Sequence, residues 1–366
     1  MHYKRFFLTT TAFILLLLIG AGGINYAVDP LQYFHRAWFY PPVFSVEQRY
    51  QNPGLARNYG GDTVIIGSSM TENFVPSQVD QILGVKSVKL SMSAATAREE
   101  AMMIDLALRR GQVKTVIWGL DFASLKGAPN RVSDEDVPFP YYLYDRQPVN
   151  DLAYLFSITA LENSLQILKN YYQHIPTPSP ELEYLNNWSD KYWFDHRPIM
   201  QRWQEEQSAR NSGTKLYQGV DGSLPAMRRS FDINILPLVK ANPEVEFLIY
   251  YPPYSILRYR SMWEEDPDLF DAELGIKHYI FAELQQFPNV SLYDFQADPV
   301  LTFDLDNYKD YSHHSTLYNR LILEALASKD PKYLVTPSNI NRLLTDLRVQ
   351  VETLDVESMY KGTPGS

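Results

Sequence analysis

The hydrophobic pattern divides the chain into an apolar N-terminal run and a longer part in which short apolar runs alternate with amphipathic stretches. Residues 6–28 carry no charge. At about 1.5 Å per residue this run can cross a hydrocarbon core of roughly 30 Å. Lys4 and Arg5 favour a cytoplasmic position for residues 1–5. No later uncharged run reaches 18 residues, so we expect one span, with the rest of the chain outside the cytoplasmic (inner) membrane.

A cleaved signal peptide and a buried helix are the alternatives for the same run. Small residues at 20–23 resemble a cleavage region. No clean A-x-A site follows the apolar core at 15–18, however. An uncleaved transmembrane anchor is therefore our first expectation.

From residue 62 onward the pattern becomes an α/β rhythm. Short β-branched or apolar runs predict strands at residues 63–66, 85–90, 114–120, 246–251 and 290–294. Helices are expected at 96–110, with a Thr96-x-x-Glu99 capping box and a stop at Gly111, and at 316–327. This alternation predicts an α/β domain over 61–335 with a mostly parallel sheet covered on both faces.

Two flanking segments lack this rhythm. Residues 29–60 are aromatic and proline-containing, and we interpret them as a juxtamembrane linker that packs on the main domain. Residues 336–366 form the C-terminal part. Apolar positions between 340 and 354 have helical spacing and predict a helix packed on the domain, and 362–366 is expected to fray.

Residues 128–227 interrupt the α/β pattern and predict a large helical and aromatic insertion. A helix is expected near 153–172, and Trp188, Trp193 and Trp203 follow it. Loops at the carboxyl ends of strands commonly shape substrate sites. The tryptophans suit either a sugar-stacking wall or the packing of a core or lid.

Composition removes several classes of function. A net charge of −10 repels nucleic-acid backbones, so no nucleic-acid partner is expected. The absence of cysteine excludes thiol catalysis, disulfides and cysteine-based zinc sites. No cofactor is predicted.

The first candidate chemical motif is the segment 65–73. An apolar strand leads to Gly67, Ser68 and Ser69 and then, we expect, into a helix. Such a turn would expose a hydroxyl at the carboxyl edge of a sheet and direct backbone N–H groups at a developing oxyanion. The plain alternative is a turn with an N-cap serine.

The second motif is the segment 307–315, in which Asp310 and His313 are three residues apart. This spacing lets the carboxylate orient the imidazole, whose other nitrogen can take a proton from a serine. A metal site is the natural rival for Asp-x-x-His-His, but no second cluster of ligands stands out. An exposed loop in which His313 and His314 have no role is the other alternative.

Together, the strand–Gly-x-Ser and Asp-x-x-His motifs resemble those of the SGNH (GDSL-type) hydrolase superfamily. The likeness is greater to the branch that includes alginate O-acetyltransferases and teichoic-acid D-alanylation proteins. It covers roughly residues 62–327. It implies a three-layer, flavodoxin-like fold in which Ser69 is the nucleophile, His313 the general base and Asp310 its orienting partner. Ser68 replaces the usual Asp and is expected to be structural.

Two positions between these motifs depart from the family pattern. Ala94 stands where the family has a Gly whose N–H enters the oxyanion hole. Asp121 stands where the family has an Asn, and an ionised carboxylate cannot donate to an oxyanion. Either another group supplies the missing hydrogen-bond donor, or Asp121 orients something else, such as the hydroxyl of the substrate that accepts the acyl group. Tyr251, at the end of a strand, is expected to line the cleft or to close a rigid turn.

The resemblance implies a membrane-anchored, extracytoplasmic or periplasmic O-acyltransferase, with O-acetylation of an exopolysaccharide or another cell-surface polymer the favoured reaction. An acyl donor and a polysaccharide acceptor are the expected substrates. A multispanning membrane protein would have to deliver the acyl groups. The alternatives are an esterase or deacetylase with the same triad, and a non-catalytic carbohydrate-binding subunit of a polysaccharide secretion complex.

Overall fold

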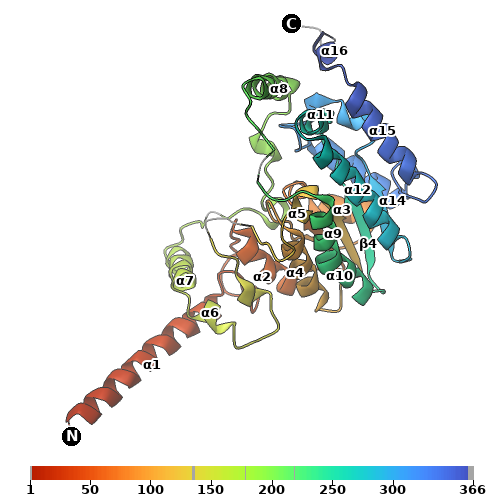
Figure 1. Ribbon diagram of the computed structural model, residues 1–366. Helices are drawn as coiled ribbons and strands as arrows, with labels where there is room; N and C mark the ends of the chain where they lie inside the picture. The colour runs from red at the N-terminus through yellow and green to blue at the C-terminus, as the bar shows by residue number, and fades with distance from the viewer. Residues whose placement is uncertain (1, 134–136, 178, 218, 362–366) are drawn as a thin grey trace.

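A five-stranded sheet forms the centre of the computed structural model, which describes residues 2–133, 137–177, 179–217 and 219–361 (Figure 1). All neighbouring strands are parallel, and their order is β2–β1–β3–β4–β5. The strands are β1 (Thr63–Gly67), β2 (Ser87–Lys89), β3 (Thr115–Gly119), β4 (Glu246–Tyr251) and β5 (Val290–Asp294). The prediction of an α/β fold with a parallel sheet is therefore confirmed.

Both faces of the sheet are buried, because successive side chains of each strand enter different cores. Val64 and Ile66 of β1 join one core, whereas Ile65 joins the other. The first core also takes side chains from α4 (Ala97–Leu108), α9 (Leu224–Ser230), α10 (Leu236–Ala241), α12 (Pro267–Leu284) and α15 (Ile340–Thr353). The second takes side chains from α3 (Pro76–Leu83), α8 (His196–Asn211) and α14 (Thr316–Ser328). Helix α11 (Ile256–Glu265) contributes to both.

Local sequence signals account for several boundaries. Glu99 N–H donates to the Thr96 hydroxyl at 3.3 Å, and Thr96 N–H donates to the Glu99 carboxylate at 2.8 Å, which completes the predicted capping box of α4. Helix α15 buries Leu343, Leu347 and Val351, as its spacing predicted. The short α16 (Val356–Lys361) follows, and the expected frayed end at 362–366 lies outside the described residues.

The linker segment contains a helix that its sequence did not predict. Helix α2 (Gln48–Asn58) carries Pro53 and is mostly polar, so it has no apolar stripe. Its polar side chains pack inward: Gln51 donates to Leu31 O at 3.0 Å and Asn52 donates to Ser91 O at 2.9 Å. The segment does pack on the main domain, through the hydrogen bond of Asn52 and through Leu55 and Ala56, which are buried in the first core.

Helix α1 (His2–Val28) is long and apolar enough to cross a membrane, and its C-terminal end is fixed in the domain (Figure 1). Asn25 Nδ2 donates to Leu155 O at 2.8 Å, and Ser164 Oγ donates to Asn25 Oδ1 at 3.0 Å. The Asp29 carboxylate then accepts the Tyr154 hydroxyl at 2.8 Å and the N–H groups of residues 33–35. We call these contacts the anchor joint.

The insertion has two parts with different neighbours. The first part contains η1 (Tyr141–Leu143), α6 (Leu152–Leu155) and α7 (Ile158–Tyr172), and its α6 and α7 pack around the end of α1. The second contains η2 (Leu182–Tyr184), η3 (Ser189–Lys191) and α8, which packs on α11. The remaining short elements are α5 (Phe122–Leu125), η4 (Phe231–Ile235), α13 (Pro299–Thr302) and η5 (Leu305–Asn307).

Candidate active site

Ser69 lies just beyond the carboxyl end of β1, in a turn that only glycine can begin. Gly67 has φ +147°, and a Cβ there would lie 2.7 Å from Gly119 O on the neighbouring strand. The Thr71 hydroxyl donates to Ser68 O at 2.9 Å and closes the turn. The helix expected directly after Ser69 is not there, because turns continue to Asn73 and α3 begins only at Pro76. Helix α3 therefore does not begin at Ser69, so its N-terminal N–H groups cannot be those expected at the oxyanion.

The second motif forms a tight loop that fixes Asp310 against His313. Lys309 N–H donates to His313 O at 3.0 Å. One Asp310 oxygen accepts the N–H groups of Ser312 and His313, each at 2.9 Å. The other lies 2.8 Å from His313 Nδ1. The loop thus orients the carboxylate before the imidazole engages it.

The two motifs meet in one chain of hydrogen bonds. Ser69 Oγ lies 2.8 Å from His313 Nε2, on the opposite side of the ring from Asp310. Burial alone would raise the pKa of Asp310, but hydrogen bonds from His313 and from the loop N–H groups hold it at about 2. An Asp310 carboxylate that is ionised at neutral pH favours the tautomer with the proton on Nδ1, in which Nε2 can accept the serine proton.

Trp188, which comes from the insertion, contacts both Ser69 and His313. Its indole N–H donates to Ser69 O at 3.0 Å, and its ring meets the His313 ring edge-on at 5.2 Å between centroids. Asn73 Oδ1 accepts the backbone N–H groups of Trp188 and Ser189 at 2.9 and 3.1 Å. Lys309 Nζ lies 4.1 Å from the Trp188 ring centroid. The insertion therefore supplies one wall of the triad.

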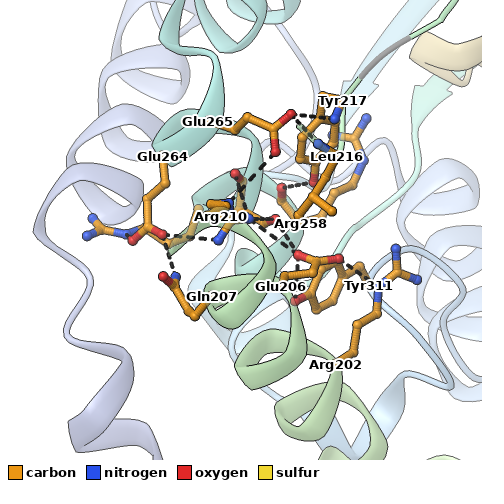
Figure 2. A network of polar contacts seen from close by, with 12 residues as sticks. Arg202, Glu206, Gln207, Arg210, Leu216, Tyr217, Arg258, Glu264, Glu265 and Tyr311 are labelled. Atoms are coloured by element: carbon orange, nitrogen blue, oxygen red, sulfur yellow. Dashed lines mark hydrogen bonds and ion pairs between the residues drawn. The ribbon is translucent and has the colours of Figure 1, made fainter. Parts of the chain in front are cut away.

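A polar network connects the second part of the insertion to the loop of Asp310 (Figure 2). Glu206 on α8 accepts the Tyr311 hydroxyl at 3.2 Å and the Ser261 hydroxyl at 2.6 Å. Arg210, one turn along the same helix, pairs with Glu264 of α11 at 3.3 Å. Because Tyr311 directly follows Asp310, this network holds the triad loop from outside the cleft.

The backbone of Tyr311 is held as well. Its carbonyl accepts both the N–H and the hydroxyl of Ser255 at 2.9 Å, at the start of α11. The Arg202 guanidinium lies 4.8 Å from the centroid of the Tyr311 ring. Tyr311, the neighbour of Asp310, is thus held by contacts from two elements that are distant in sequence, α8 and α11.

Ser69 and His313 face a cavity of about 560 Å³. Ser68, Ala94, Asp121 and Trp188 also line it. A second cavity of about 570 Å³ shares Glu72, Ser93 and Trp188 with the first, and its other walls come from the linker and the insertion. The two together are large enough to hold more than a small acyl ester.

Ala94, which was assigned to the glycine position of the family, has a backbone conformation that favours glycine. Its φ is +49°, in the left-handed region, and it lines the Ser69 cavity. Across the residues that the structure describes, neither Ala94 N–H nor Ser69 N–H has a hydrogen-bond acceptor. These two groups are the candidate oxyanion donors.

Asp121 is an acceptor at every contact it makes. It takes the hydroxyls of Ser68 at 3.1 Å and Tyr254 at 2.7 Å, and the N–H of Ala123 at 2.9 Å, which caps α5. Asp121 therefore orients protein hydroxyls beside the cavity, in line with the expectation that it cannot replace the family Asn as a donor.

Tyr251 does not line the cleft, in contrast to one of our expectations. Its side chain is fully buried and stacks on Phe122, with ring centroids 5.6 Å apart. It points into the core because alternate residues of β4 face opposite sides of the sheet. Tyr254, three residues on, reaches the cavity instead. Of the other tryptophans, Trp203 is buried in the second core and Trp193 is exposed.

His314 has a different environment from His313. It is buried, its Nδ1 lies 3.1 Å from Ser315 O, and burial lowers its pKa to about 4. A separate group formed by Asp195, His196 and Asp306 has the proximity of metal ligands. Asp195 is already paired with Arg197, however, and His196 with Asp306 at 2.6 Å, which makes this an ion-pair cluster.

The sequence analysis gave no role to Glu72 or Lys309, although both lie inside the two motifs, and it left the role of Trp188 open. Glu72 lies in the Ser69 turn and lines both cavities, and burial raises its pKa although the Gln48 amide, 2.5 Å away, lowers it in part. Its position three residues after Ser69 was the available signal. Nothing in the sequence indicated that Trp188 would contact the turn that contains Ser69.

No protein-family model matches this chain, and a search of curated proteins finds no match.

Proposed function

We propose that this protein is a membrane-anchored, serine-dependent O-acyltransferase that acts outside the cytoplasmic membrane on a polysaccharide. The observation that carries the proposal is the hydrogen-bonded chain Asp310–His313–Ser69, open to a cavity at the carboxyl edge of a parallel sheet. Such a chain makes a serine nucleophilic in acyl transfer on several unrelated folds.

The chemistry follows from the geometry. Ser69 Oγ attacks the acyl carbonyl carbon while its proton passes to His313 Nε2, and the carbonyl electron pair moves to the oxygen. When the tetrahedral species collapses, the alkoxide of the donor leaves with that proton, and the acyl group stays on Ser69. His313 then takes the proton of an acceptor hydroxyl, whose oxygen attacks the acyl-serine; when the acyl–Oγ bond breaks, His313 returns that proton to Ser69.

The oxyanion in both steps would be held by the free N–H groups of Ser69 and Ala94. Asp121 would keep Ser68 and Tyr254 in place beside them without touching the oxyanion. Asp121 would therefore act as a positioning residue.

The fold supports the resemblance to the SGNH superfamily. The strand order β2–β1–β3–β4–β5, with both faces covered, is that of flavodoxin-like folds, in which ligands bind outside the carboxyl ends of the strands. The triad lies at this end. The chain would then belong with the O-acetyltransferase branch, in which the motif around the nucleophilic serine reads Gly-Ser-Ser.

The membrane assignment completes the proposal. Helix α1 would cross the bilayer with Lys4 and Arg5 inside and the α/β domain outside. A single span offers no path for acyl groups, so a separate multispanning protein would deliver them. No cofactor enters any of the steps.

The test is acyl release from p-nitrophenyl acetate by the full chain in detergent, with a polysaccharide oligomer present. We compare wild type, Ser69→Ala and His313→Ala, with the exposed Ser212→Ala as the matched serine control. Loss of activity in the first two variants, with acetyl on the oligomer, supports the transferase. Free acetate alone points to an esterase. A wild type no faster than Ser69→Ala refutes the triad and favours a non-catalytic binding subunit.

A further inference from the structure

A group of exposed apolar side chains lies on α6 and α7, beside the C-terminal end of α1. It consists of Leu152 and Phe156 at α6 and of Ile158, Leu165 and Tyr172 along α7, and we call it the collar. Ile158 and Tyr172 are 74% and 72% exposed, and a contiguous group of such side chains marks an interaction surface. Figure 1 shows α6 and α7 beside the end of α1 that enters the domain.

The collar begins at the same membrane depth as the last residues of the apolar run of α1. A hydrocarbon core of about 30 Å takes up roughly 20 helical residues, so a span starting at Phe6 ends at about Asn25. Asn25 donates to Leu155 O and Ser157 O, on either side of Phe156. A Cβ added to Gly22 would lie 3.0 Å from the Phe156 ring, about one helical turn deeper than Asn25. Phe156 therefore lies at the depth of acyl chains if α1 crosses a bilayer.

Helix α7 has the side-chain pattern of a helix that lies in a membrane interface. Ser164 and Ile167 face α1 and its linker. Ile158, Leu165 and Tyr172 recur every seven residues and form one exposed apolar stripe. Glu162, Gln166 and Lys169 are exposed beside this stripe and can remain in water while the stripe meets lipid.

Aromatic residues with polar edges lie near the same level. Tyr26 is exposed on the last turn of α1, and exposed Trp38 donates its indole N–H to Ala27 O at 3.2 Å. Tyrosine and tryptophan concentrate at the boundary between hydrocarbon and water, where one end of the ring is dry and the other wet.

We propose that the collar is inserted into the outer leaflet of the bilayer that α1 crosses, with phospholipid acyl chains against Phe156, Ile158, Leu165 and Tyr172. This rests on the transmembrane assignment of α1 in the proposed function, and it is independent of the serine chemistry. A lipid occupant is favoured over a second protein because the collar is continuous with the surface of α1 that lipid must already cover. The collar and α1 together would fix the height and tilt of the domain.

The experiment uses the natural absence of cysteine, which allows one spin label at a time on the full chain. The protein is reconstituted in phosphatidylcholine–phosphatidylglycerol vesicles with labels at Ile158→Cys or Leu165→Cys. Leu317→Cys and Val349→Cys are matched controls, since both are exposed apolar helix residues far along the chain. A label at Leu16→Cys gives the reference value for a position within the membrane-spanning part of α1. Collision of each label with oxygen, which dissolves in lipid, and with a nickel chelate, which stays in water, gives its depth.

We expect the oxygen-to-nickel collision ratio at 158 and 165 to exceed that at 317 and 349 by at least about fivefold and to approach that at 16. Ratios at 158 and 165 equal to the controls, with 16 in lipid, would overturn the proposal. Labels there that both reagents fail to reach would also overturn it, because protein would then cover the collar. A water-exposed label at 16 would refute the anchor itself, whatever the activity of Ser69.

Discussion

Replacement of Asp310 by Asn tests the proposed triad most sharply, because it keeps the shape of the side chain and removes its charge. In the native loop the carboxylate accepts two N–H groups at 2.9 Å and His313 Nδ1 at 2.8 Å. An amide has one acceptor oxygen and one NH₂ donor. If its oxygen keeps the two backbone bonds, its NH₂ faces Nδ1, which must then give up its proton.

The size of the effect follows from this exchange. With Nδ1 as an acceptor, the ring proton moves to Nε2, which can no longer accept the proton of Ser69 2.8 Å away. The same change of tautomer in a serine triad lowers kcat by about 10⁴. At about 1.4 kcal/mol per tenfold change, this raises the barrier by roughly 5.5 kcal/mol.

The assay is kcat for p-nitrophenyl acetate hydrolysis by the full chain at pH 7, with the melting temperature measured in parallel. Asp306→Asn is the matched control, since Asp306 is exposed, lies in the preceding turn and pairs with His196 outside the cleft. A variant Asp310→Asn that keeps its melting temperature and more than a tenth of the wild-type kcat would refute the reasoning.

Three further predictions concern the surroundings of the triad. Trp188→Phe keeps the ring but loses the N–H bond to Ser69 O, which is worth about 1 kcal/mol, so kcat/KM should fall about fivefold; no change would show that the bond does not position Ser69. Glu206→Ala should lower the free energy of unfolding by about 3 kcal/mol because Tyr311, Ser261 and Arg210 lose their shared acceptor, whereas exposed Glu205→Ala should change it by under about 0.5 kcal/mol in urea titrations. Buried His314 has a pKa of about 4 against 6.5 unfolded, so the unfolded chain binds the extra proton and stability falls as pH drops from about 6.5 to 4, by up to about 1.4 kcal/mol per pH unit. His314→Gln should remove that part of the slope, and an unchanged slope would assign it to other groups.

The sequence predicts the sheet well because its strands are buried on both faces. β4 and β5 have the predicted bounds, and β1, β2 and β3 differ by one to a few residues. A short, continuous apolar run such as 63–66 is typical of a strand buried on both faces of a parallel sheet, so its apolar character is sufficient to predict the strand. Helix α2 was missed for the opposite reason: it is held by Gln51 and Asn52, whose hydrogen bonds leave no periodic pattern.

The candidate site was predictable where both partners lie in short motifs, and not where they come from the insertion. Ser69, Asp310 and His313 meet as the two motifs suggested. Trp188 reaches Ser69 across 119 residues, through two backbone bonds to Asn73 that no local pattern reveals. Tyr251 and Tyr254 were indistinguishable in sequence, because the direction of each side chain depends on where β4 ends.

The anchor joint has a consequence for the order in which the protein can assemble. Asn25 is bonded to Ser164, 139 residues further along the chain, and Asp29 to Tyr154, 125 residues further along. At about 5–20 residues per second, synthesis of the intervening chain takes roughly 7–28 s. Before those residues are made, Asn25 has none of its partners, and the side of α1 that later meets Phe156 is uncovered. A newly made chain therefore passes through a stage in which α1 is complete but is not yet joined to the rest of the domain.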